Sequence, residues 1–261
     1  MTAAKAVAVY APPAYWEDAR KHLMKRDRVM KRLIPQFGDG CLQTRGDAFV
    51  TLARSIVGQQ ISVKAAQTVW DRFVVLPKKF SAANVLKLKV DDMRAAGLSA
   101  RKVEYLVDLA LHFVNRTSPV TVWETMDDEA IIAELTGIRG IGRWTAEMFL
   151  IFHMLRPNVL PLDDVGLING ISRSYFSGDV VSRSDAREVA AAWAPYCSVA
   201  TWYIWRSLDP LPVAYQLPVA YWEVHHGRRF VSLSLRTSDS SLRAQRGNPG
   251  LYGSPRPSAS R

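Results

Sequence analysis

Apolar residues recur every three or four positions along most of the chain up to about residue 210. This spacing is typical of helices that bury one face. Residues 51–75, 100–114, 129–136, 142–155 and 199–208 all follow it. No run of alternating apolar and polar residues before the C-terminal tail is long enough to predict a strand. The sequence therefore predicts an all-α fold.

Length and cysteine content narrow the class of protein further. A chain of 261 residues can form one large domain or two small ones. Cys41 and Cys197 are the only cysteines, too few for a four-cysteine zinc site or an iron–sulfur cluster. The five histidines lack metal-ligand spacing, so we expect no metal site. We also expect a reducing, cytoplasmic location, no signal peptide and no membrane span.

The net charge of +10 favours a polyanionic partner, although the charge is unevenly distributed. About half of it lies in residues 222–261, where seven arginines outweigh Glu223 and Asp239. This segment is rich in Ser, Arg, Gly and Pro and has little periodicity, so we interpret it as a disordered basic tail. A folded domain is then expected over residues 1–221.

The stretch GIRGIGRWTA, residues 137–146, lies between two predicted helices and predicts a tight helical hairpin over residues 135–146. Gly137, Gly140 and Gly142 are candidate DNA-binding residues, and Gly140 and Gly142 permit positive φ or close approach of another backbone. Such a turn directs backbone N–H groups outward at the start of the second helix, where an anion such as a DNA phosphate binds. Arg139 and Arg143 would add positive charge beside it. The alternative is an ordinary hairpin whose glycines only pack.

Two adjacent aspartates, Asp163 and Asp164, begin the next helical segment in the stretch PLDDVGLING. A carboxylate is stabilised at a helix N-terminus, so either residue could simply be an N-cap. Beside a DNA-binding hairpin, however, a negative charge would repel phosphate. Its presence there indicates a cationic species that it stabilises.

These motifs together resemble the helix–hairpin–helix DNA glycosylase superfamily. The resemblance extends over about residues 15–212 and includes RSIVGQQISVKAA, GLSARKVEYL, LTGIRGIGRWTA, PLDD and WAPYCSVATWYIWRSLDP. It implies two helical lobes with the hairpin and an active-site cleft between them. It also implies removal of alkylated purines such as 3-methyladenine and 7-methylguanine from duplex DNA, as the first step of base excision repair.

The resemblance assigns roles to individual residues. Within the catalytic loop 160–168, Asp164 corresponds to the catalytic aspartate, and Asp163 would be a cap or a supporting residue. Trp144 occupies the position at which strand-cleaving relatives carry a Schiff-base lysine, which predicts a monofunctional enzyme. The base pocket would include Trp144, Trp205 and, as a weaker candidate, Trp202, whose indole faces suit a cationic base.

The DNA-contacting residues implied by the resemblance include Gln59 and Gln60. Gln60 lies at the wedge position, the residue that fills the gap left by a flipped nucleotide; the alternative is a pair of solvent-facing glutamines. Met148 and Val165 replace tyrosines that line the pocket in some relatives. The family also suggests a monovalent cation at the hairpin carbonyls and a monomer. The remaining alternatives are a glycosylase for oxidised or deaminated bases and a non-catalytic DNA-binding protein.

Overall fold

The computed structural model describes residues 12–44, 46–115 and 119–208. Every regular element in these ranges is helical, which confirms the all-α prediction. None of these helices is both long and apolar enough to cross a membrane. The predicted basic tail, residues 222–261, lies outside the described residues.

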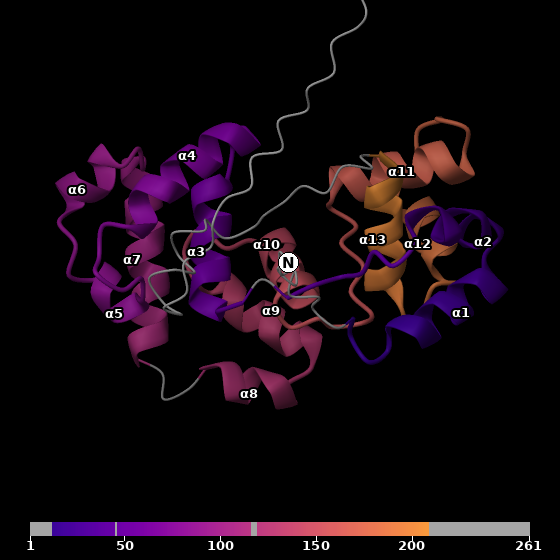
Figure 1. Ribbon diagram of the computed structural model, residues 1–261, viewed down its shortest axis with the longest axis horizontal. Coiled ribbons are helices and arrows are strands. Elements are labelled where there is room, and N and C mark those ends of the chain that lie inside the picture. Colours follow the sequence, from indigo (N-terminus) through magenta and orange to yellow (C-terminus); the bar gives the residue numbers. More distant parts are fainter. Residues whose placement is uncertain (1–11, 45, 116–118, 209–261) are drawn as a thin grey trace, which may run out of the picture. The chain divides into compact units, whose positions relative to one another are not determined.

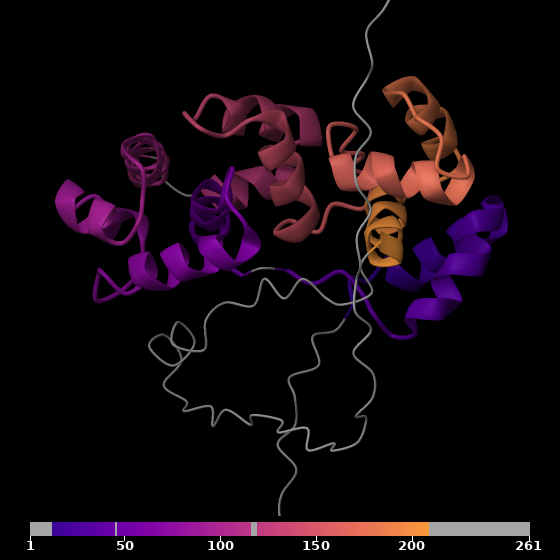
Figure 2. The ribbon, with the colours of Figure 1, turned by 90° about the horizontal axis from the view of Figure 1, so that it is seen from above.

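The helices form two groups (Figures 1 and 2). In the first group, N-terminal and C-terminal segments pack together, with the indigo helices beside the orange one. Its elements are α1 (Trp16–Arg26), α2 (Arg28–Leu33), η1 (Ile34–Phe37), α11 (Val165–Tyr175), α12 (Arg183–Ala190) and α13 (Cys197–Leu208). The second group contains α3 (Ala48–Gly58), α4 (Val63–Val74), α5 (Ala82–Val85), α6 (Val90–Ala95), α7 (Ala100–Asn115), α8 (Pro119–Thr125), α9 (Asp128–Thr136) and α10 (Arg143–Phe152).

A buried carboxylate joins N-terminal and C-terminal helical segments of the first group. Asp27 is the N-cap of α2, and its Oδ1 accepts from the backbone N–H groups of Val29 and Met30. Its Oδ2 accepts from the Tyr175 hydroxyl at 2.7 Å and from Trp193 Nε1 at 2.9 Å. Because a buried charge is tolerated only when it is hydrogen-bonded, this residue fixes α2 against the C-terminal segments.

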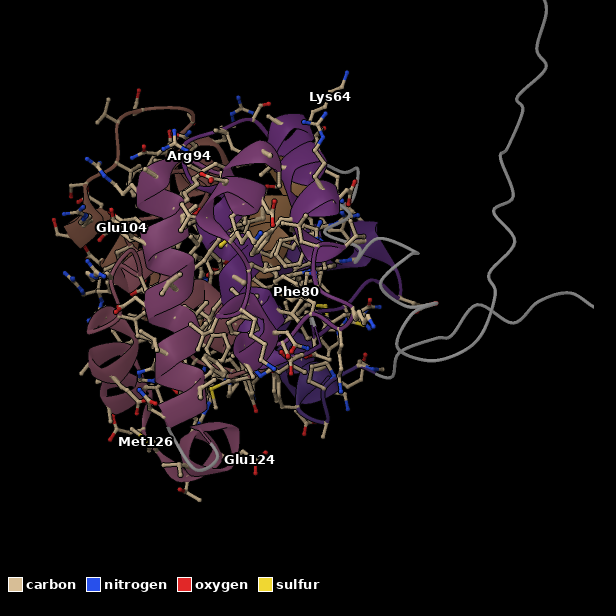
Figure 3. The ribbon with its side chains drawn as sticks, turned by 90° about the vertical axis from the view of Figure 1, so that its left-hand side faces the viewer. Lys64, Phe80, Arg94, Glu104, Glu124 and Met126 are labelled. Carbon is tan, nitrogen blue, oxygen red and sulfur yellow. The ribbon has the colours of Figure 1, made fainter. Side chains whose placement is uncertain are left out.

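The second group is built around α7. Its buried residues, Val103, Leu106, Leu109 and Ala110, have the three- and four-residue spacing expected of an amphipathic helix. Figure 3 shows Phe80 among the packed side chains of this group, where its ring contacts those of Phe49, Trp70 and Phe73.

The structure corrects one detail of the predicted helices. Residues 51–75 do not form one continuous helix, because the helical structure is interrupted at residues 59–62, between α3 and α4. Gln60 there has a φ of 58°, and Ser62 caps α4 by accepting from the backbone N–H of Ala65. The N-cap of α12 is Ser182, which forms a reciprocal capping box with Asp185.

Candidate active site

The hairpin connects α9 to α10, as the sequence predicted. Gly137 ends α9, Gly140 has a φ of 85°, and Gly142 is the N-cap of α10. Within the described residues no side chain caps α10, so its first-turn N–H groups remain available to a ligand. The backbone therefore has the geometry of an anion site.

Residues from α3 and α7 hold this loop in place. Gln59 at the end of α3 donates from Nε2 to the Gly140 carbonyl oxygen at 2.8 Å. The ring of Tyr105 lies so close that a Cβ added to Gly140 would be 2.2 Å from its Cδ2. Asp108 Oδ2 accepts from the Arg139 backbone N–H at 2.8 Å. These contacts fix the path of the loop before any ligand binds.

The two hairpin arginines are engaged by carboxylates. Arg143 forms a bidentate pair with Glu129 and donates from Nε to Glu147 Oε1 at 3.0 Å. Arg139 has its Nε 3.8 Å from Asp108 Oδ1. Both arginines lie beside the loop, as the sequence predicted, but each is paired with carboxylates. Their contact with DNA stays a prediction.

A cavity of about 700 Å³ lies beside the hairpin. Its lining comes from the break after α3, the start of α7 and the hairpin loop: Gln59, Gln60, Ser99, Ala100, Arg101, Lys102, Tyr105, Gly140, Ile141 and Gly142. This lining contains two cations and no carboxylate. Lys102 donates from Nζ to the Val57 carbonyl oxygen at 2.8 Å, and burial lowers the pKa of this lysine.

Asp164 is where three helices meet. It is the N-cap of α11, and its Oδ1 accepts from the Leu167 backbone N–H at 2.6 Å. The same oxygen accepts from Trp205 Nε1 of α13 at 2.8 Å. Its Oδ2 accepts from Trp144 Nε1 of α10 at 2.9 Å. The N-cap and the candidate catalytic aspartate are therefore one residue, while Asp163 pairs with Arg183 at 2.6 Å.

The surroundings of this carboxylate combine exposed and buried groups. Trp144 is 42% exposed, which excludes simple core packing for this residue. Trp205 is half-buried and stacks on Phe152. Val165, directly after Asp164, is 71% exposed, and Met148 is buried. The site thus presents a carboxylate and an indole to a ligand from outside.

Two other predicted site residues, Trp202 and Gln60, have no hydrogen bond to this carboxylate among the described contacts. Trp202 contacts the rings of Trp16 and Tyr203, and the Arg206 guanidinium lies over its ring. Its place in the base pocket stays a prediction.

Gln60 is exposed, and its positive φ is rare for a residue that is not glycine. Strained backbone of this kind concentrates at functional sites, which agrees with the wedge position.

Sequence reasoning missed the supporting residues of α7, Tyr105 and Asp108. Tyr105 lies in the motif GLSARKVEYL and Asp108 follows it, but only the tertiary structure shows that both residues support the hairpin.

Within the described ranges no cluster of His, Cys, Asp or Glu could hold a metal ion. The Gly140 carbonyl already accepts from Gln59, so a monovalent cation would need other carbonyl groups of the loop. That cation stays a prediction.

Comparison with known proteins agrees with this geometry. Residues 53–195 match the family described as HhH-GPD superfamily base excision DNA repair protein. DNA-3-methyladenine glycosylase 1 of Schizosaccharomyces pombe is 30% identical over 72% of this chain and 86% of its own length.

Solved structures show the same likeness. The 3-methyladenine DNA glycosylase of the same yeast, in complex with abasic DNA, aligns with a TM-score of 0.67 at 30% identity, over 75% of this chain and 98% of that one. DNA-3-methyladenine glycosidase from Bacillus halodurans aligns with a TM-score of 0.68 at 33% identity, over 73% of this chain and 89% of that one. The chain therefore belongs to the HhH-GPD superfamily of base excision DNA repair proteins.

Proposed function

We propose that this protein is a monofunctional DNA glycosylase that hydrolyses the N-glycosidic bond of alkylated purines in duplex DNA. The observation that carries the proposal is the convergence of the Trp144 and Trp205 indole N–H groups on the Asp164 carboxylate. The names of the relatives, which are 3-methyladenine glycosylases, support the substrate class. The expected cytoplasmic location, monomeric state and domain boundaries stay predictions.

The chemistry of base release explains why a fixed carboxylate is useful. Cleavage of the bond between sugar and base passes through a sugar with oxocarbenium character, as in glycoside hydrolysis. A carboxylate held in one orientation stabilises this positive charge and can orient a water at C1′. Because Asp164 is held by two side chains and by the start of α11, it needs little reorganisation during the reaction.

Alkylated purines suit this site better than neutral bases. Alkylation at N3 or N7 gives the purine a positive charge, which makes it a good leaving group that needs little general-acid catalysis. The exposed indole of Trp144 offers an electron-rich face to such a cation. Trp144 also occupies the position that the resemblance gives to a Schiff-base lysine, and an indole cannot form a Schiff base. The product is therefore an intact abasic site.

The anion site of the hairpin supplies the DNA contact. The uncapped first turn of α10 and the cationic cavity beside it suit phosphate groups. The start of α10 also leads directly to Trp144, so phosphate binding at the hairpin brings the sugar–base bond towards Asp164.

The test is base release from methylated duplex DNA, followed by chromatography of the free bases. We expect 3-methyladenine and 7-methylguanine to be released without strand cleavage and without borohydride-trapped enzyme. Asp164→Asn should slow release about 100-fold or more, because an amide lacks the charge that stabilises the sugar cation. Asp163→Asn is the matched control, since Asp163 pairs with Arg183 and not with the indoles, and it should release bases at nearly the wild-type rate.

Three outcomes would contradict the proposal. Release at the wild-type rate from Asp164→Asn would remove the catalytic role of this residue. A trapped covalent intermediate would show a bifunctional enzyme. Tight DNA binding without release of any methylated base would favour first an oxidised or deaminated base as substrate, and then a non-catalytic binding protein.

A further inference from the structure

The two oxygens of the Asp164 carboxylate are not equivalent. Each carboxylate oxygen can accept two hydrogen bonds in the plane of the group. Oδ1 accepts two, from the Leu167 backbone N–H and from Trp205 Nε1. Among the described residues, Oδ2 accepts one, from Trp144 Nε1. Oδ2 therefore keeps one acceptor position for a group that comes from outside the protein.

The two indoles that donate to these oxygens differ in packing and exposure. Trp205 stacks on Phe152 with ring centroids 5.6 Å apart and planes 14° apart. Its ring also lies against Gly166, where an added Cβ would be 3.3 Å from Cδ1 and Nε1. Trp144 lies in the first turn of α10 and is 42% exposed. Thus the donor to Oδ1 is fixed by packing against Phe152 and Gly166, and the donor to Oδ2 is more exposed.

We infer that Trp205 and Trp144 are positioning residues that act through their N–H groups on Asp164, in addition to any stacking on the base. Trp205 and the start of α11 hold Oδ1. Trp144 holds Oδ2 so that its remaining acceptor position points to the sugar or to the attacking water. This inference rests on the proposed function and assigns Oδ2 as the oxygen that meets the developing positive charge.

A role in stacking and a role in positioning make different predictions for DNA without a lesion base. A duplex with a pyrrolidine at the lesion position presents a cation where the sugar cation develops. A duplex with a tetrahydrofuran at the same position is neutral but similar in shape. Neither probe carries a base, so stacking on a base contributes to neither dissociation constant, and their ratio measures the preference of the site for a cation at the sugar position.

The experiment measures this ratio for the wild type, Trp144→Phe and Trp205→Phe, with Asp164→Asn as the reference for complete loss. Phenylalanine keeps an aromatic ring but has no N–H. We expect each Trp→Phe change to reduce the preference for pyrrolidine about fivefold or more, because a hydrogen bond to a charged group is lost. Affinity for the tetrahydrofuran duplex should stay within about twofold of the wild type.

Base release from methylated DNA provides the second readout. At saturating DNA, both variants should release bases about fivefold or more slowly than the wild type. The matched control is Trp70→Phe, because the buried Trp70 N–H has no partner among the described residues and lies in the second group of helices. This control should change neither the ratio nor the rate.

The result that overturns the inference is an unchanged pyrrolidine preference in both Trp→Phe variants while the wild type releases bases. The tryptophans would then act only by stacking. If the wild type releases no base and shows no preference for pyrrolidine, the proposed function itself fails, which is a separate outcome.

Discussion

The hairpin glycines offer a sharp test of the structure, because Gly140 and Gly142 belong to one motif but have different surroundings. Gly140 has a φ of 85°, and a Cβ there would be 2.2 Å from Cδ2 and 2.4 Å from Cγ of Tyr105. An alanine in the left-handed region costs about 1–2 kcal/mol. Overpacking against the ring adds about 1–3 kcal/mol. Gly140→Ala should therefore lower the free energy of unfolding by about 2–5 kcal/mol.

Gly142→Ala should leave the stability nearly unchanged but weaken DNA binding. Its φ is −92°, and no atom of the described residues lies within 4 Å of an added Cβ, so the free energy of unfolding should change by no more than about 1 kcal/mol. The new methyl group, however, occupies space that a phosphate needs to reach the uncapped N–H groups of α10. We expect the dissociation constant for a duplex with a tetrahydrofuran abasic analogue to rise about fivefold or more.

Urea unfolding and fluorescence anisotropy at constant salt measure the two effects separately. A second comparison isolates the steric part of the Gly140 effect. In a Tyr105→Ala background, Gly140→Ala should cost only the left-handed penalty of about 1–2 kcal/mol. Equal destabilisation by the two glycine substitutions, or wild-type DNA affinity of Gly142→Ala, would refute the reasoning.

Two further predictions concern the wedge position and a half-buried histidine. Gln60 has a backbone φ of 58°, which glycine adopts without strain, so Gln60→Gly should leave the free energy of unfolding unchanged or raise it by about 1 kcal/mol. Single-turnover base release should fall about fivefold or more, because the wedge side chain is lost. A fall in both quantities would indicate a structural role instead. Burial lowers the pKa of His153, so the unfolded state takes up its proton first, and stability should fall as the pH drops below about 6.5. Urea unfolding at pH 7.5 and 5.5 should show a smaller difference in His153→Gln, and an unchanged difference would assign the pH dependence to other groups.

Sequence reasoning predicted the elements that depend on local patterns. Apolar spacing predicted the helical class, and the glycines between two such patterns lie in the loop that joins α9 to α10. It did not predict the break at Gln59–Ser62, because apolar spacing continues across it. The break depends on a positive φ at Gln60, which is unusual for glutamine and leaves no sign in the periodicity.

The contacts of the site depend on chain segments that are distant in the sequence. Trp144 and Trp205 were predicted to be pocket residues, but their common partner Asp164 lies 20 and 41 positions away along the chain. Only the packing of α10, α11 and α13 shows that both N–H groups reach one carboxylate. In the same way, the carboxylates that engage Arg143 come from α9 and α10, and sequence alone did not predict this pairing.

One helix connects the two chemical tasks of the site. Gly142 begins α10 at the anion site, and Trp144, two positions later, donates to Asp164 Oδ2. A shift of the first turn of α10 on phosphate binding would therefore move the donor that orients the carboxylate. The contacts of Gln59, Tyr105 and Asp108 fix the loop that leads into this turn in the absence of DNA. Their effect is to reduce the reorganisation that remains for the sugar–base bond to reach a correctly oriented Asp164.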